Sequence, residues 1–348
     1  MKTSPRYFYC CLIIITVLWI FAAHTGHSES LFVKFGTTEP FPSESPTAQA
    51  LQVFQQEVVN ILGPRLRLQI FPDGQLGSAL QLMEGLQFGN IEMGILPAEL
   101  LNPHLPILSS LSMPYIFRDN THRFRVLDGP IGKQLLAMFE ALNLLGLGFL
   151  DTGMKGFLTK TDPLSSPEDF QDQHIGIIRY CLEPPCSDIR CQLPTYHLET
   201  LGATEETILA ENIAAAWQSN ALTGLEYTPL QHIVPHMLPS EDTLHLTITA
   251  HTALPDVIIV SKRWFDSLEP QIQQALIKAS AHMVAHQREC FADAQQREYE
   301  ALQAQGLILN NPVEYEKFWE AIQPMYQAVG KQAGAEFTSI LQRIRAIR

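Results

Sequence analysis

The sequence contains little positive charge. Its 348 residues include 23 lysines and arginines against 36 aspartates and glutamates, so the formal net charge is −13 at pH 7. No basic run interrupts this acidic background. Because nucleic-acid binding needs a basic surface that neutralises phosphates, the composition argues against a nucleic-acid partner.

Long apolar runs are also scarce. The run from Cys10 to Ala23 follows Arg6 and precedes the polar stretch HTGHSES. This is the layout of a secretory signal peptide, with the Ala22-Ala23 region or Ser28 to Ser30 as candidate cleavage sites. No later segment is apolar for long enough to span a bilayer. We therefore expect residues 1–30 to be a signal peptide and the mature chain to be exported and soluble. An uncleaved N-terminal anchor is the alternative, because the cleavage site is not sharply marked.

The sequence lacks the short motifs of common catalytic sites. It has no GxSxG elbow, no HExxH helix and no P-loop. Carboxylates such as Glu99, Asp151 and Glu226 stand singly, and no histidine is implied as the partner of a cysteine nucleophile. We expect a protein that is not an enzyme and that needs no cofactor.

Cysteines number six, and Cys10 and Cys11 would leave with the signal peptide. The remaining four are Cys181, Cys186, Cys191 and Cys290, an even set for an oxidising compartment. We predict a disulfide that involves the Cys- and Pro-rich stretch, although four cysteines allow three connectivities. A metal site made of the three thiolates in that stretch is the alternative.

Three possible metal ligands share one face of a predicted helix. His282, His286 and Cys290 are spaced at i, i+4 and i+8, which aligns them on a helix surface. Zinc would accept these ligands, but the sequence offers no visible fourth one. We therefore expect no metal here.

A strand–helix–strand pattern organises the first half of the chain. Arg65 to Phe71 alternates apolar and polar residues, as a strand does. Ser78 and Gln81 form a capping box that begins a helix, and Gly89 is the left-handed residue that ends it. Ile91 to Leu96 is the next strand. Such a crossover makes a parallel sheet and predicts an α/β fold.

The rest of the chain alternates in the same way, and the pattern restarts near Thr152. A first domain would therefore end near Asp151. The other expected strands are 31–35, 144–150, 174–178, 221–224, 245–250 and 257–260, and the other expected helices are 47–62, 122–127, 131–142, 195–201, 210–219, 270–305 and 312–348, the last divided near Gly330 to Gly334.

Several motifs in order resemble one known family. FPDGQLGSALQLMEGLQFGNIEMG, which begins at Phe71, resembles the signature of the substrate-binding proteins (P subunits) of TRAP transporters, the family of the C4-dicarboxylate and sialic acid binders. MPYIFRDNTHRFRVLDGPIG, SSPEDF at Ser165 and VIIVSKRWFDSLEP at Val257 continue the resemblance. It covers roughly Leu31 to Gln327.

The resemblance implies a two-domain periplasmic-binding-protein (Venus flytrap) fold with a long bracing helix. Residues 31–150 and 252–269 would form domain 1, and 151–251 domain 2 with a Cys- and Pro-rich insertion at 181–194. Residues 270–305 would be the bracing helix and 306–348 C-terminal helices. The chain would cross between domains at 149–160 and 245–260. It would act as a monomeric periplasmic receptor that captures a small organic ligand by hinge closure and delivers it to membrane permease subunits.

The family's ligand site is altered in this sequence. Most members hold a carboxylate with an arginine whose planar fork donates two parallel hydrogen bonds. In an alignment without gaps, Gly176 stands at the position of this arginine, and Arg179 follows three residues later. Lys155 stands for a second arginine. The other positions that the resemblance implies are Glu226, retained; Tyr227, in place of an asparagine; Ala214, in place of an aromatic; and Glu39, Phe41 and Pro97 in loops of domain 1.

Two explanations remain for these departures. In the first, the alignment is shifted by a few residues around the insertion, so that the wrong residues are compared with the family's site positions. In the second, the site no longer recognises a simple carboxylate. The protein would then be a repurposed receptor that carries a larger apolar or lipid-like ligand or reports to a sensor or partner protein.

Overall fold

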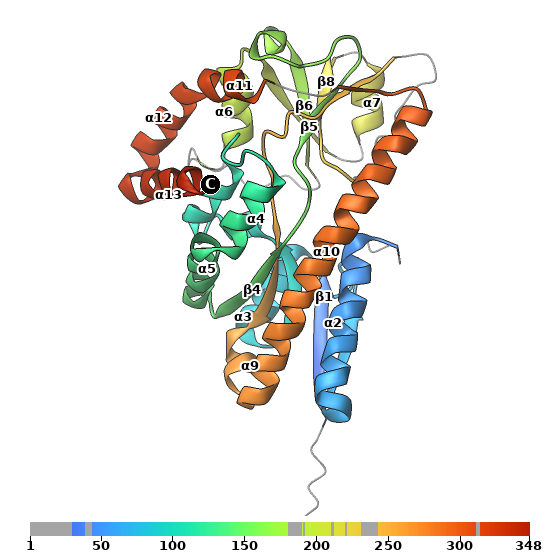
Figure 1. Ribbon diagram of the computed structural model, residues 1–348, viewed down its shortest axis with the longest axis vertical. Coiled ribbons are helices and arrows are strands. Elements are labelled where there is room, and N and C mark those ends of the chain that lie inside the picture. Colours follow the sequence, from blue (N-terminus) through green and yellow to red (C-terminus); the bar gives the residue numbers. More distant parts are fainter. Residues whose placement is uncertain are drawn as a thin grey trace, which may run out of the picture.

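The computed structural model describes residues 30–348 except 39–43, 180–189, 191, 210–211, 220, 231–242 and 311–313, and it leaves out the side chains of Ile178 and Arg179. The described residues form two β-sheets, which lie one above the other along the long axis with helices around them (Figure 1). We call the part built on the five-stranded sheet the first domain and the part built on the six-stranded sheet the second domain.

The five-stranded sheet has the order β2-β1-β3-β10-β4. Its strands are β1 (Leu31–Thr37), β2 (Leu66–Phe71), β3 (Met93–Pro97), β4 (Leu144–Leu150) and β10 (Asp256–Ser261). β1 is parallel to both β2 and β3, whereas β10 is antiparallel to its neighbours β3 and β4. The predicted crossover is therefore present, and β1 lies between its two strands.

The helix of this crossover, α3 (Ala79–Phe88), begins and ends as the sequence predicts. The Ser78 hydroxyl accepts a hydrogen bond from the Gln81 backbone, and the Gln81 side chain accepts one from the Ser78 backbone. Gly89 ends the helix at a φ of 78°, in the left-handed region that glycine adopts without strain. The buried residues Leu82, Met83 and Leu86 form its apolar stripe.

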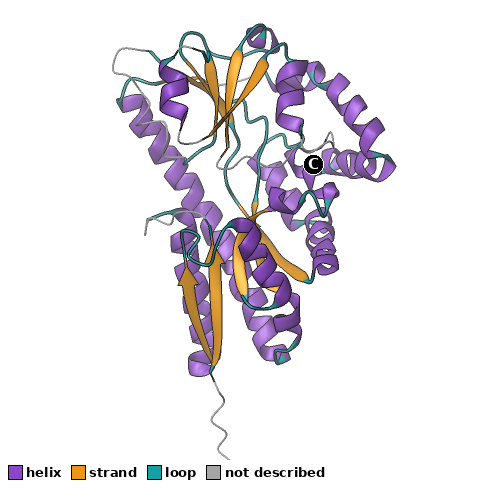
Figure 2. Cartoon of the chain, turned by 180° about the vertical axis from the view of Figure 1, so that it is seen from behind, coloured by secondary structure: helices purple, strands orange, loops and turns teal. Residues whose placement is uncertain are grey.

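The six-stranded sheet has the order β11-β9-β5-β8-β6-β7. Its strands are β5 (Gly156–Thr159), β6 (His174–Arg179), β7 (Thr204–Leu209), β8 (Gly224–Tyr227), β9 (His245–Thr247) and β11 (Ile308–Asn310). β6 is parallel to β7 and β8, and β5 is antiparallel to β8 and β9. Figure 2 shows the two groups of strands, with connecting loops between them.

Helices cover both sheets. The α-helices are α2 (Pro46–Leu62), α3, α4 (Asn120–Asp128), α5 (Pro130–Ala137), α6 (Leu193–Thr200), α7 (Ile213–Gln218), α9 (Lys262–Asp266), α10 (Pro270–Ala304), α11 (Tyr315–Ala321), α12 (Gln323–Ala333) and α13 (Ala335–Ala346). The 3-10 helices are η1 (Gly63–Arg65), η2 (Ala98–Leu101), η3 (Pro106–Ser112), η4 (Met138–Leu142) and η5 (Pro167–Phe170).

The long helix α10 extends along both domains (Figure 1). Near its start, Leu276 and Met283 are buried in the core between α2 and the first sheet. Near its end, Leu302 is buried in a core of the second domain. Because one continuous helix contributes to both cores, it braces the two domains against each other.

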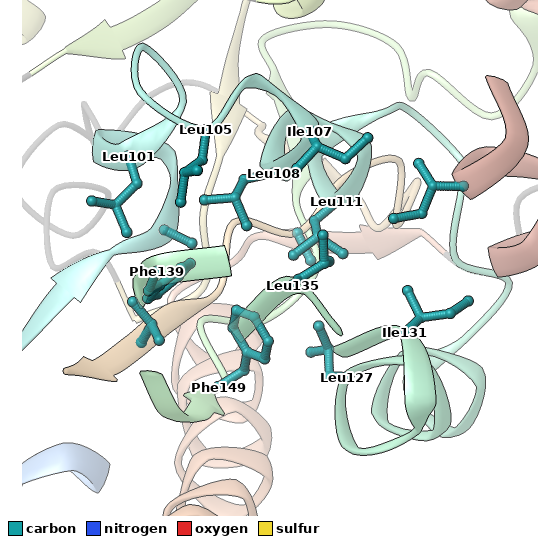
Figure 3. Close-up of a cluster of buried hydrophobic side chains, with 14 of the residues drawn as sticks. Leu101, Leu105, Ile107, Leu108, Leu111, Leu127, Ile131, Leu135, Phe139 and Phe149 are labelled. Carbon is teal, nitrogen blue, oxygen red and sulfur yellow. The ribbon is translucent and has the colours of Figure 1, made fainter. Parts of the chain in front are cut away.

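The C-terminal helices return to the first domain. Ile340 and Ile344 of α13 belong to the same buried cluster as Phe139 and Phe149. Figure 3 shows part of this cluster, where leucines from the 101–111 segment meet Phe149 and the side chains of α4 and α5. The last residues are tied to the loop just before α4, since Arg118 donates a hydrogen bond to the Arg345 carbonyl at 3.0 Å.

Some elements differ from the sequence prediction. β7 was not expected, because its sequence TEETIL is mostly polar; it lies at the edge of its sheet, where polar side chains reach solvent. β8 begins at Gly224, where the predicted strand 221–224 ends. Residues 306–348 contain the short strand β11 before their helices, and those helices are three rather than two.

Candidate ligand-binding site

The chain passes between the two sheets at two described segments. Residues 151–155 lead from β4 to β5, and residues 248–255 lead from β9 to β10. The two crossing segments are hydrogen-bonded to each other, since the Lys155 backbone donates to the Thr252 carbonyl at 2.8 Å and the Thr152 hydroxyl donates to the Leu254 carbonyl at 2.8 Å. The segments therefore run as a pair.

Charged side chains meet where these segments reach the second sheet. Lys155 Nζ donates to Glu226 Oε2 at 2.5 Å, and His251 Nε2 lies 3.1 Å from Glu226 Oε1. The Thr249 hydroxyl lies 2.8 Å from His251 Nδ1. We assign the neutral tautomer in which His251 donates to the carboxylate and accepts from Thr249. The carboxylate of Glu226 is thus satisfied on both oxygens.

The protonation states of this cluster follow from burial and pairing. Burial alone would raise the pKa of Glu226, but the Lys155 ammonium and the hydrogen bond from His251 outweigh it and hold that pKa well below its ordinary value. Burial lowers the pKa of His251, and the contact with Glu226 opposes this only in part. The Lys155 side chain keeps 13% of its surface exposed, whereas Glu226 keeps 7%. Lys155 is therefore the more exposed member of the pair.

Aromatic rings enclose the imidazole of His251. Phe157 stacks on one side, with ring centroids 4.5 Å apart, and His197 stacks at 5.2 Å. Tyr115 meets His197 edge-on at 5.7 Å. Burial, followed by the proximity of His251, lowers the pKa of His197 strongly. The imidazole of His251 is therefore held in place by packing as well as by hydrogen bonds.

A second buried ion pair stabilises the first crossing segment. Arg123 of α4 donates to Asp151 Oδ1 at 2.5 Å and to the Gly153 carbonyl at 3.1 Å, and both charged side chains are almost completely buried. Gln287 of α10 donates to the Asp151 carbonyl at 2.8 Å and accepts from the Asp151 backbone N–H at 2.9 Å. The end of β4 is thus fixed to both α4 and the bracing helix.

Of the three site residues predicted in the first domain, the structure describes Pro97. Glu39 and Phe41 lie outside the described residues. Pro97 is the last residue of β3 and pairs with Asp256 of β10. Arg179 is the last residue of β6, opposite Leu209 of β7, and its side chain is not described.

Gly176 does not open a cavity in the second domain. A Cβ at this position would lie 2.6 Å from a methyl group of Ile208 and 2.6 Å from a methyl group of Leu225. These distances are shorter than any ordinary contact between carbon atoms, so apolar side chains already fill the space into which a side chain at 176 would project.

The remaining predicted residues lie apart from the charged cluster. Ala214 is exposed on α7, and Tyr227 is buried with Trp217 and Leu225 in a core of the second domain. Because side chains alternate along β8, Tyr227 and Glu226 face opposite sides of the sheet. Among the predicted positions with described side chains, the structure brings Lys155 and Glu226 into contact.

Sequence reasoning missed His251, His197 and Tyr115. They come from three different segments and have no common motif, so only the fold brings them together. A weak signal was available for His251, because a histidine between two apolar strands has to be satisfied by a partner.

Of the predicted cysteine and histidine sites, the structure describes the one on α10. Cys181, Cys186 and Cys191 lie outside the described residues. Within the described part of the chain, no group of three histidines, cysteines or carboxylates is arranged to hold a metal ion. His282 instead contacts Glu57 at 3.0 Å, and Cys290 Sγ lies 3.4 Å from His286. Burial raises the pKa of the Cys290 thiol, so it stays protonated.

A hollow of about 290 Å³ lies between α6 and α12, lined by Gln192, Thr195, Tyr196, Glu199 and Gln332, and it includes no predicted site residue. Among the residues that the structure describes, no helix combines the length and apolarity needed to cross a bilayer.

Two α/β domains joined by paired crossing segments and braced by one long helix define a two-domain solute receptor. The sequence profile of the family described as bacterial extracellular solute-binding protein, family 7, matches residues 35–332. The chain belongs to this family, and it is a substrate-binding protein of the TRAP transporter type.

Curated relatives agree over most of their length. The chain is 25% identical over 297 residues to a solute-binding protein of Verminephrobacter eiseniae, covering 85% of this chain and 84% of the relative. It is 23% identical over 320 residues to the C4-dicarboxylate-binding periplasmic protein DctP of Rhodobacter capsulatus, covering 89% of each.

Solved structures share the fold. A TRAP periplasmic solute-binding protein of Ochrobactrum anthropi superposes with a TM-score of 0.80 at 22% identity, covering 92% of this chain and 98% of that one. A TRAP protein of Polaromonas sp. bound to D-erythronate gives a TM-score of 0.73 at 23% identity, covering 92% and 99%. A Sulfitobacter sp. protein with bound β-D-galacturonate gives 0.74 at 20% identity, covering 90% and 99%. The two-domain α/β architecture predicted from the sequence is therefore confirmed.

Proposed function

We propose that this protein is a periplasmic receptor that binds a small organic acid by closure of its two domains and presents it to the membrane permease subunits of a TRAP transporter. The observation that carries this proposal is that Lys155 and His251 both contact Glu226 where the crossing segments reach the second sheet. An ammonium held there is available to an anion that enters between the domains.

Lys155 suits this role because of its geometry. Its ammonium has three donors, and one of them is directed to Glu226. The others are available to a ligand carboxylate. Because lysine is a point charge on a flexible stem, we expect weaker geometric selection than a bidentate arginine would give.

The ligands bound in similar solved structures support this ligand class. The structures from Polaromonas sp. and Sulfitobacter sp. contain D-erythronate and β-D-galacturonate, which are both hydroxylated acids. We propose a ligand of the same class for this chain, bound without any change in its covalent bonds. The receptor would act as a monomer after export.

The repurposed receptor for a larger apolar ligand is not favoured. Such a ligand would need space where Gly176 and Ala214 replace larger side chains. Apolar neighbours fill the space at Gly176, and Ala214 lies on an exposed helix surface. Neither residue enlarges a cavity in the described structure.

Thermal unfolding in the presence of a ligand panel tests the proposal. The panel contains hydroxylated monocarboxylates, hexuronates and C4-dicarboxylates, with the matching neutral sugars and alcohols as controls. A ligand at about one hundred times its dissociation constant adds roughly 2.7 kcal/mol to the free energy of unfolding, which is easily measured as a rise in Tm. Stabilisation by acids but not by their neutral counterparts is expected. Stabilisation only by apolar molecules would show that the acid-binding proposal is wrong.

A further inference from the structure

Exposed large apolar side chains gather at one end of the molecule. Seven such side chains are exposed among the described residues, and five of them lie near the starts of β1 and α10 or near the ends of α2 and α3. These five are Phe32, Val59, Ile61, Phe88 and Ile277. We call this end, formed by the starts of β1, β2 and α10 and the ends of α2 and α3, the basal end; it lies at the bottom of Figure 1.

The topology explains why elements far apart in sequence meet there. β1 and β2 are parallel and begin together, with Leu31 opposite Leu66. α2 ends just before β2, which brings Val59 and Ile61 to the same end. α10 runs antiparallel to α2, with His282 against Glu57, so Ile277 is level with the last turn of α2.

The other two side chains are among the most exposed apolar groups. Phe88, at the end of α3, is 67% exposed. Phe32 is 50% exposed, because it faces away from α2, whereas Val33 and Phe35 face α2 and are buried. A large aromatic side chain in water is unfavourable, and several at one end indicate a contact surface.

The same end presents cations without counter-charges. Arg67 pairs in register with Phe32, Arg263 lies on α9 beside Gly89, and Lys278 follows Ile277. All three are exposed, and none takes part in an ion pair among the described residues.

Two acidic residues nearby are already paired with other cations. Asp266 contacts Lys262 at 2.7 Å, and Glu269 contacts Arg65 at 2.6 Å. Arg67, Arg263 and Lys278 are therefore the cations that this end can present to a negatively charged partner.

The apolar N-terminal segment joins the fold at this end. β1 begins at Leu31, and residues 24–30 separate it from the run Cys10 to Ala23. Seven residues span at most about 25 Å. Whenever that run lies in a bilayer, during export or as an anchor, the basal end is held close to the membrane surface.

We propose that the basal end is a membrane-docking surface, which inserts its exposed apolar side chains into the interface of an anionic bilayer and places Arg67, Arg263 and Lys278 against the headgroups. Apolar insertion combined with basic residues is the pattern of interfacial membrane binding. The second domain then points away from the lipid.

Vesicle sedimentation tests the proposal on the chain from Ser30 onward, which contains every described element. The vesicles contain equal parts of phosphatidylglycerol and phosphatidylcholine, with pure phosphatidylcholine for comparison. We expect the protein to bind the anionic vesicles and to be released by salt. Phe32→Ser combined with Phe88→Ser should lower the partition coefficient about tenfold or more. The matched control, Leu80→Ser with Ile308→Ser, removes the two exposed apolar side chains located elsewhere and should leave binding unchanged.

A second set of variants separates charge from apolar insertion. Arg67→Gln, Arg263→Gln and Lys278→Gln together should weaken binding to anionic vesicles by about a hundredfold, at roughly fivefold for each charge. Lys133→Gln with Lys331→Gln, two exposed lysines located elsewhere, should have little effect. Failure of the unaltered protein to bind vesicles, or equal losses in basal and control variants, would overturn the proposal. The proposal would also be wrong if the protein does not bind vesicles but the basal variants lose permease-dependent uptake. That result would assign this end to a contact with a protein. Ligand binding measured in parallel reports on the receptor function separately.

Discussion

The imidazole of His251 and the carboxylate of Glu226 are joined by a contact of 3.1 Å, although the two residues come from a crossing segment and a sheet strand. The other oxygen of Glu226 contacts Lys155, from the other crossing segment. One carboxylate therefore links both crossing segments to the second sheet. Because hinge motions are absorbed by a few residues in the connecting segments, we expect ligand binding and domain position to be coupled at this point.

Removal of the Lys155 ammonium should weaken both binding and folding. Lys155→Ala takes away a charged hydrogen bond to an acidic ligand, so affinity should fall about ten- to a hundredfold. It also leaves the buried Glu226 without its cation, which should lower the free energy of unfolding by about 3 kcal/mol. Calorimetric titration well below Tm measures the first effect, and denaturant unfolding measures the second.

Controls for Lys155 are available in the same chain. Arg179→Ala should reduce affinity less, and Lys133→Ala, on an exposed helix position, should leave it unchanged. Unaltered affinity in folded Lys155→Ala, together with loss of binding in Ala214→Trp, would mean that the ligand is recognised by shape and apolar contact.

Stability should decrease as the pH falls. The pKa values of His251 and His197 are lowered by burial, so below about pH 6.5 the unfolded chain binds protons that the folded chain does not. The free energy of unfolding then falls by up to about 1.4 kcal/mol per pH unit for each histidine. The lowered pKa of Glu226 adds a loss of the same sign below about pH 4.5.

One substitution isolates the histidine contribution to this pH dependence. His197→Phe retains the aromatic packing and removes one titrating group. The slope of the free energy of unfolding against pH, measured between pH 6.5 and 5, should therefore decrease by about 1.4 kcal/mol per pH unit, which corresponds to one proton. His104→Phe, at an exposed position, serves as the control. Equal slopes for His197→Phe and the unaltered protein would contradict the burial argument.

Restoring an arginine at position 176 should fail. In Gly176→Arg the Cβ alone would meet Ile208 and Leu225 at 2.6 Å, and the guanidinium would enter an apolar core. We expect a loss of at least about 3 kcal/mol in the free energy of unfolding, and no gain in affinity for acids. The control Ala214→Arg, on an exposed helix surface, should change stability by less than about 0.5 kcal/mol. A stable Gly176→Arg protein that binds acids more tightly would show that the site does extend to β6.

The cysteines of the insertion should form at least one disulfide. Cys181, Cys186 and Cys191 lie within eleven residues of a chain that we expect to be exported, and a bridge there would restrict a Pro-rich stretch. Thiol titration of the denatured, non-reduced mature protein measures the outcome. Four reactive thiols per chain would refute the prediction, whereas two or fewer are expected.

Local rules predicted much of this fold but only part of the site. The capping box at Ser78 and the left-handed Gly89 define α3 through contacts within a few residues, so the sequence was sufficient. β7 escaped prediction because its stability comes from pairing with β6 and not from apolar alternation. The resemblance to the family pointed to Lys155 and Glu226 one by one, but the stack of Phe157, His251 and His197 depends on three distant segments. Such contacts have no sequence period, and only the folded chain reveals them.

Gln287 provides a test of whether the bracing helix controls the hinge. Its side chain makes two hydrogen bonds to the Asp151 backbone, at 2.8 Å and 2.9 Å, and is buried. Gln287→Ala would leave a buried N–H and a buried carbonyl without partners, and each should cost about 1–3 kcal/mol. Since Asp151 begins the first crossing segment, amide hydrogen exchange at Gly153 should accelerate, and ligand affinity should decrease because the segment is no longer fixed. Gln303→Ala, an exposed position on the same helix, is the control for helix propensity. Loss of stability without faster exchange at Gly153 would mean that Gln287 supports the fold but does not position the hinge.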